Sequence, residues 1–144
     1  MKTFLLVEDR LDDVLLVEWE FKKAPGLRLR AVRDGQEAID YLLGLPPYDD
    51  RFAFPLPNVI LLDIKMPRLS GFDFLTWLHS SSPGDLKLIP VIVMSGSDLE
   101  QDVRKAYQMG ANLYMTKPVN WDQFRERMRL LGILWTEHVE TPVL

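Results

Sequence analysis

Short apolar runs alternate along the chain with longer stretches in which apolar residues recur at helical spacing. The runs have few polar positions, which is typical of strands buried on both faces. In the first longer stretch, Leu11, Val14, Leu15 and Trp19 follow one another at intervals that indicate a helix. The predicted strands cover residues 4–7, 27–32, 59–62, 89–94 and 112–115, and the predicted helices cover residues 11–23, 36–43, 72–79, 99–109 and 121 to about 139.

This strict alternation predicts the fold class. A strand followed by a helix and another strand forms a parallel pair joined by a right-handed crossover. The chain is therefore expected to be an α/β protein, with a doubly wound five-stranded parallel sheet and helices on both faces. Residues 45–57, which contain four prolines, are expected to form an ordered loop, and Asp98 is expected to cap the helix over residues 99–109. Ligands of such sheets bind at the carboxyl ends of the strands.

Composition narrows the class of protein. A chain of 144 residues, 47% hydrophobic, is long enough for one well-buried core. A net charge of -4 argues against a nucleic-acid-binding protein, which normally carries a basic face. There is no cysteine, so disulfides and thiolate metal sites are excluded. The apolar run in residues 1–10 is too short for a signal peptide or a membrane span, so we expect a cytoplasmic protein with no membrane partner.

Polar residues follow four of the predicted strands. Glu8 and Asp9 follow the first strand, Asp63 the third, Ser95 the fourth and Lys117 the fifth. Any one of these side chains alone is more often a helix cap, a turn residue or a solvated charge. Because the carboxyl ends of parallel strands share one edge of the sheet, we expect all five to converge there.

Three acids, a hydroxyl and a lysine in one place favour phosphoryl chemistry. Carboxylates that lie close together repel one another, and a hard cation such as Mg²⁺ relieves the repulsion. A carboxylate can also act as a nucleophile and become an acyl phosphate. We therefore predict that Asp63 is phosphorylated, and that Met66, Pro67 and Gly71 shape the loop beside it.

The motifs LLVED, ILLDIKMPRLSG, VIVMSGS and LYMTKP, in this order, resemble the response-regulator receiver domain of two-component signalling. The resemblance runs from about residue 3 to residue 129 and implies a flavodoxin-like, CheY-like (βα)5 fold. The segments RDGQEAIDYL, LKLIPVIVMS and LGILWTEHV further resemble the single-domain regulators associated with bacterial and cyanobacterial phytochrome histidine kinases.

The resemblance implies the roles of the acidic residues. Asp63 is the phosphoacceptor. Mg²⁺ is held by the side chains of Asp9 and Asp63, by the main-chain carbonyl of Lys65, and by Glu8 through water. The side chain of Lys65, two residues beyond the acceptor, is placed to steer or exclude water, which affects the rate of autodephosphorylation.

The resemblance also implies which residues bind the phosphoryl group and which change conformation when it is attached. Lys117 pairs with the phosphoryl group, and Ser95 donates a hydrogen bond to it. Gly96 stands where alanine is frequent in the family and opens or loosens the loop. Tyr114 turns inward when Ser95 moves, although plain packing of the strand explains this tyrosine nearly as well. We also expect the peptide bond between Lys117 and Pro118 to be cis, so that the lysine points back into the pocket.

The implied function is that of a phosphoacceptor, which promotes only its own phosphorylation and dephosphorylation and is not an enzyme. Its expected partners are a histidine kinase, a downstream protein or a histidine phosphotransfer protein. One alternative is a constitutive interaction module with a vestigial site. Another is a phosphatase with an aspartate nucleophile, but such enzymes carry a second aspartate two residues after the first, where this chain has Lys65.

The last helix predicts a homodimer. We expect a receiver domain over residues 1–130 and a dimerisation extension over residues 131–144. Apolar residues form a stripe at alternating spacings of three and four, and a second apolar face follows it. The stripe consists of Trp121, Phe124, Met128, Leu131 and Trp135, and the second face of Leu130, Ile133 and Leu134. The residues expected in the dimer interface are Trp121, Phe124, Leu131, Leu134 and Trp135. The alternative is that the tail folds back over its own domain, near Phe52 and Phe54.

Overall fold

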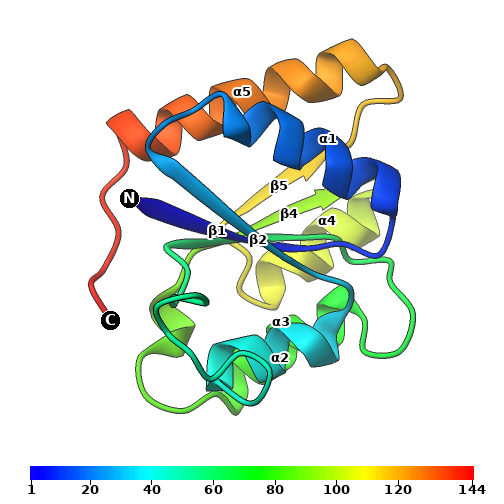
Figure 1. Ribbon diagram of the computed structural model, residues 1–144. Coiled ribbons are helices and arrows are strands. Elements are labelled where there is room, and N and C mark those ends of the chain that lie inside the picture. Colours follow the sequence, from blue (N-terminus) through cyan, green and yellow to red (C-terminus); the bar gives the residue numbers. More distant parts are fainter.

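The computed structural model describes all 144 residues and contains one parallel sheet between two layers of helices (Figure 1). The strands lie in the order β2-β1-β3-β4-β5. Helices α1 and α5 cover one face, and α2, α3 and α4 cover the other (Figure 1). The strands are β1 (Lys2–Val7), β2 (Leu27–Val32), β3 (Val59–Leu62), β4 (Val91–Ser95) and β5 (Leu113–Thr116), and the helices are α1 (Leu11–Lys22), α2 (Gly35–Leu43), α3 (Gly71–Ser80), α4 (Glu100–Gln108) and α5 (Trp121–Glu137). The predicted fold class is confirmed.

The central strands are apolar on both faces because each face is covered by helices. Along β1, Leu5 and Val7 belong to the core below α2 and α3, whereas Phe4 and Leu6 belong to the core below α1 and α5. The same alternation occurs in β3 and β4, and the side chains of β3 are almost completely buried. Two cores on one sheet leave its carboxyl edge as the place where polar side chains can gather.

Helix α1 lies where it was predicted, but of the four apolar residues that predicted it only Val14 packs against the core. Leu11, Leu15 and Trp19 are 67%, 53% and 61% exposed. The side of α1 that faces the sheet carries two acids beside two apolar residues. Its buried residues are Asp13, Val17, Glu20 and Phe21.

The first turn of α4 is also held differently from the prediction. Asp98 does not cap the helix, which begins at Glu100. The hydroxyl of Ser97 accepts a hydrogen bond from the backbone of Leu99 and donates one to Asp102 at 2.5 Å. No side chain caps α4, and Ser97 instead connects the preceding loop with the first turn of the helix.

Helix α5 continues without a break across residue 130. Phe124, Leu131 and Trp135 were predicted to lie in a dimer interface, and this is wrong for all three because their side chains are buried in the chain's own core. The ring of Trp135 packs against Phe4 with 6.0 Å between centroids, so the sheet extends far enough to cover the end of the helix. Trp121 and Leu134 are exposed.

The tail after α5 folds back over its own domain. The side chain of Lys2 donates to the carbonyl of Val139 at 2.9 Å, and that of Asn58 donates to the hydroxyl of Thr141 at 3.2 Å. These contacts lie near the amino ends of β1 and β3. Phe52 stays 90% exposed, so the tail does not cover it. None of the helices combines the length and the apolar character needed to span a membrane.

Candidate phosphoacceptor and metal site

Asp63 follows directly after β3, at the carboxyl edge of the sheet, and is only 6% exposed. Its backbone N–H donates to the carbonyl of Val7, which continues the pairing of β1 with β3. Its side chain accepts a hydrogen bond from the backbone N–H of Lys65 at 3.1 Å. The carboxylate is thus fixed in direction by strand pairing and by its own loop, with its second oxygen free to meet other groups.

Glu8 and Asp9 reach the same point from the end of β1. One carboxylate oxygen from each of Glu8, Asp9 and Asp63 lies within 4.8 Å of the others. Glu8 is buried, whereas Asp9 is exposed. Oxygen ligands with one solvent-facing member suit a hard divalent cation that keeps part of its water shell. The three acids therefore fit a divalent metal.

The electrostatics of Glu8 agree with this fit. Burial and, next to it, the neighbouring charge of Asp63 raise the pKa of Glu8 to about 8, although Lys117 acts to lower it. A carboxyl group that gives up its proton only near neutral pH marks a pocket with an excess of negative charge. A bound cation removes that excess.

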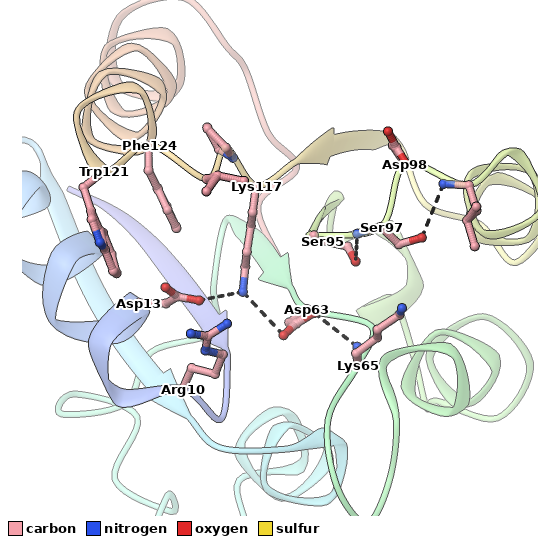
Figure 2. Close-up of a pocket in the computed structure, with 14 residues that line it drawn as sticks. Arg10, Asp13, Asp63, Lys65, Ser95, Ser97, Asp98, Lys117, Trp121 and Phe124 are labelled. Atoms are coloured by element: carbon pink, nitrogen blue, oxygen red, sulfur yellow. Dashed lines mark hydrogen bonds and ion pairs between the residues drawn. The ribbon is translucent and has the colours of Figure 1, made fainter.

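Lys117 enters the pocket from the loop after β5. Its ammonium group lies 2.8 Å from Asp13 Oδ2 and 3.5 Å from Asp63 Oδ2 (Figure 2). It is also hydrogen-bonded to Glu8. Burial acts to lower the pKa of Lys117, but the charges of these acids outweigh it and raise the pKa. The lysine is therefore held in its charged form beside the phosphoacceptor.

Asp13 also belongs to this site, although the sequence did not predict it. It is 5% exposed, lines the same pocket and pairs with Lys117. Its partner Lys117 lies 104 residues further along the chain, so no local spacing in the sequence marked Asp13 as a site residue.

The peptide bond between Lys117 and Pro118 is trans, so the predicted cis bond is wrong. The cis bond of this chain lies between Pro46 and Pro47. The backbone N–H of Lys117 donates to the carbonyl of Ser95 at 2.7 Å, which continues the pairing of β4 with β5. From that position the extended side chain already reaches the acids, and no reversal of the backbone is needed.

Ser95 and Tyr114 lie on the β4–β5 side of the pocket. Ser95 is completely buried, and its hydroxyl accepts from the backbone N–H of Ser97 at 3.2 Å. The hydroxyl of Tyr114 donates to the carbonyl of Ser97 at 2.7 Å, and burial raises the pKa of Tyr114. Gly96 is exposed, with no atom near the position of a side chain, so the loop has open space there. Both side-chain hydroxyls thus meet the backbone of one loop.

The loop from β3 to α3 carries Pro67 on its exposed side and returns to Asp63 at Gly71. A Cβ atom on Gly71 would lie 2.5 Å from the carbonyl oxygen of Asp63 and 2.5 Å from the Cα of Ile64. No other residue fits there without moving the backbone that bears the phosphoacceptor. Glycine is thus required by close approach rather than by a turn.

The pocket above Asp63 has a volume of about 720 Å³. Figure 2 shows the side chains of Asp13, Asp63 and Lys117 directed toward one another, with Lys65 and Arg10 beside them. Apolar residues form part of the lining, among them Leu99, Val119 and Trp121. The pocket is large enough to hold a small anionic group beside Asp63.

Comparison with known proteins agrees with this geometry. Residues 4–129 match the family model described as the response regulator receiver domain. The response regulator Rcp1 from Synechocystis sp. (strain ATCC 27184 / PCC 6803 / Kazusa) is 34% identical over 142 residues, which cover 98% of this chain and 93% of Rcp1.

Two solved structures are similar over nearly the full length. The Mn²⁺-bound form of Rcp1 has a TM-score of 0.88 at 33% identity, covering 99% of this chain and 100% of that one. The phosphorylated cyanobacterial phytochrome response regulator RcpA has a TM-score of 0.89 at 31% identity, covering 99% of each chain. With this fold and these acids at the carboxyl edge of its sheet, the chain belongs to the response regulator receiver domain family.

Proposed function

We propose that this protein receives a phosphoryl group on Asp63 from a histidine kinase, with Mg²⁺ as the cofactor. The observation that carries the proposal is the arrangement around Asp63. Its buried carboxylate lies next to two further acids and 3.5 Å from the ammonium group of Lys117. A nucleophile, a metal-binding acid pair and a fixed cation are the parts that phosphoryl transfer needs.

In the transfer step, an oxygen of Asp63 attacks the phosphorus atom of the phosphohistidine. A P–O bond forms and the P–N bond breaks, and the leaving imidazole nitrogen keeps the electron pair and takes up a proton. Glu8, Asp9, Asp63 and the main-chain carbonyl of Lys65 would hold Mg²⁺, which supplies positive charge for the phosphoryl oxygens. Lys117 supplies further positive charge from the protein itself.

Ser95 and Tyr114 are proposed to report the phosphorylated state. The hydroxyl of Ser95 is buried at the end of β4 and lines the pocket, where it can donate to a phosphoryl oxygen. Its movement would change the loop of Ser97, to which the hydroxyl of Tyr114 is bonded. This connects Asp63 with the outer surface of β5.

The kinase is proposed to be of the phytochrome type. Response regulators of phytochrome systems work with histidine kinases, and the similarity to Rcp1 and RcpA spans nearly the whole chain, beyond the part that the family model matches. Phosphotransfer from a panel of purified histidine kinases that includes phytochrome-type kinases would test the choice of partner.

The proposal is tested by adding beryllofluoride, a phosphoryl mimic, in the presence of Mg²⁺. Trp121 lines the pocket, so its fluorescence should change on binding. Asp63→Asn should abolish the response, and Asp9→Asn should weaken Mg²⁺ affinity and with it the response. No response in the parent chain would favour a constitutive module, and repeated turnover of phosphoesters would favour a phosphatase.

We also propose a homodimer, formed through the exposed side of α5. Leu130 and Leu134 are 52% and 43% exposed. Arg127, on the same side of the helix, donates to the carbonyl of Thr116 in β5, so this side lies beside the sheet edge. Exposed apolar residues next to Leu113 of β5, which is 39% exposed, would form a contiguous surface suited to a second copy.

A further inference from the structure

Lys117 is shared among three acids, Glu8, Asp13 and the phosphoacceptor Asp63. The side chain of Asp13 makes its one hydrogen bond to the ammonium group of Lys117, at 2.8 Å, while Asp63 Oδ2 lies further away at 3.5 Å. Asp13 is 5% exposed although it stands in the first turn of a helix whose neighbouring residues, Leu11 and Asp12, face the solvent. A buried carboxylate without a partner is costly, so Lys117 and Asp13 hold each other.

Phosphorylation of Asp63 changes what Lys117 has to neutralise. An attached phosphoryl group brings additional negative charge close to the lysine. The carboxylate of Asp13 repels that charge and, at the same time, holds the ammonium group that would bind it. The opposite holds for a divalent cation, which the negative charge of Asp13 attracts.

We propose that Asp13 is a positioning residue that retains Lys117 in the unphosphorylated protein and thereby opposes phosphorylation of Asp63. The inference rests on the proposed function, since it needs Asp63 to be the phosphoacceptor. It predicts that replacing Asp13 changes the affinities for Mg²⁺ and for a phosphoryl mimic in opposite directions. Without the charge of Asp13, the pocket binds Mg²⁺ more weakly but binds a phosphoryl mimic more tightly once Mg²⁺ is saturating.

The test compares Asp13→Asn and Asp13→Ser with the parent chain in two titrations. The first titrates Mg²⁺ and the second titrates beryllofluoride at saturating Mg²⁺, both followed by tryptophan fluorescence. Asp12→Asn is the matched control, because it removes the same charge from an exposed position in the same helical turn. Circular dichroism shows whether each variant is folded, and the second substitution guards against a packing defect peculiar to the first.

For both Asp13 variants we expect Mg²⁺ affinity to fall and beryllofluoride affinity to rise, each by roughly 3- to 10-fold, the effect of one charge at such a distance in a partly buried site. Asp12→Asn should match the parent in both titrations. A residue with only a structural role would weaken both ligands when it is replaced. Weaker binding of both ligands, or agreement with Asp12→Asn, would therefore overturn the inference.

The failure of the proposed function gives a different pattern. In that case the parent chain itself does not bind beryllofluoride, or Asp63→Asn binds it equally well, and the inference falls together with the function. If the parent binds in an Asp63-dependent manner and the Asp13 variants do not separate the two ligands, only the inference fails.

Discussion

Glu8 is 2% exposed, lies close to Asp63 and is hydrogen-bonded to Lys117, so its charge depends on what else occupies the pocket. In the metal-free protein, burial raises its pKa from 4.5 to about 8. The folded protein therefore keeps a proton that the unfolded chain has already released at lower pH. Between these two values folding is favoured less and less as the pH rises.

Metal-free protein should accordingly lose stability as the pH rises from about 5 to 8, by at most ~1.4 kcal/mol per pH unit. Mg²⁺ competes with the proton on Glu8, so its affinity should increase over the same interval. Urea unfolding without metal and Mg²⁺ titration, each at several pH values, measure the two trends. Glu8→Gln should reduce the pH dependence of both the stability and the Mg²⁺ affinity. A pH dependence equal to that of the parent would show that Glu8 is not the titrating group.

At the scale of elements, the loop after β3 is fastened to the start of α2. Asp34 caps α2 by accepting from the backbone of Glu37 at 2.9 Å, and its other oxygen pairs with Arg68. The backbone N–H of Gly35 donates to the carbonyl of Leu69 at 3.0 Å. The loop that presents the carbonyl of Lys65 is thus held from outside the site.

Arg68 has a φ of 61°, a left-handed conformation that is unfavourable for a residue with a side chain. Arg68→Ala and Arg68→Gly both remove the ion pair with Asp34, but only glycine relieves the backbone. We expect Arg68→Gly to be more stable than Arg68→Ala by about 1 kcal/mol in urea unfolding. Equal stabilities, or a more stable alanine variant, would contradict the account of this loop.

The apolar runs predicted the strands well, because every side chain of a strand that is covered on both faces must be apolar. Strand β3 is the example, since all of its side chains are buried. Helix α1 was predicted as an element, but the buried side could not be chosen from its apolar residues. Its inward side carries Asp13 and Glu20, whose partners are Lys117 and Lys23. The pairing of Asp13 with Lys117 joins residues far apart in the sequence, and so no local pattern reveals it.

The same limit explains the other differences. The predicted cap of α4 by Asp98 does not form, and the hydroxyl of Ser97 holds the first turn by donating to Asp102, a contact that the position of Asp98 in the sequence did not reveal. In contrast, Glu8, Asp9 and Asp63 were found from strand ends alone, since strand order brings β1 and β3 together. A site built on neighbouring strand ends is therefore readily predicted, and one completed by a helix is not.

For the whole molecule, the buried positions of Leu131 and Trp135 change the test of dimerisation. Truncation after residue 130 would remove part of the core, so surface substitutions are the better choice. Leu130→Glu combined with Leu134→Glu should turn a dimer into a monomer, as measured by light scattering at micromolar concentration. Charges at the centre of an apolar contact are poorly tolerated.

Leu43→Glu provides the control, because Leu43 is 40% exposed but lies on α2, on the opposite face of the sheet. It should leave the mass unchanged. A parent chain that is already monomeric, or a double variant that still dimerises, would sink the proposed interface on α5.

The central claim is that Asp63 accepts a phosphoryl group, and chemical phosphorylation tests it most directly. The parent chain and Asp63→Asn are incubated with acetyl phosphate and Mg²⁺, and the intact mass is measured, followed by peptide mapping after reduction with borohydride. The parent should gain the mass of one phosphoryl group, located on Asp63. No such gain should occur when Mg²⁺ is chelated before the incubation. An unmodified parent, or an adduct that persists in Asp63→Asn, would contradict the account.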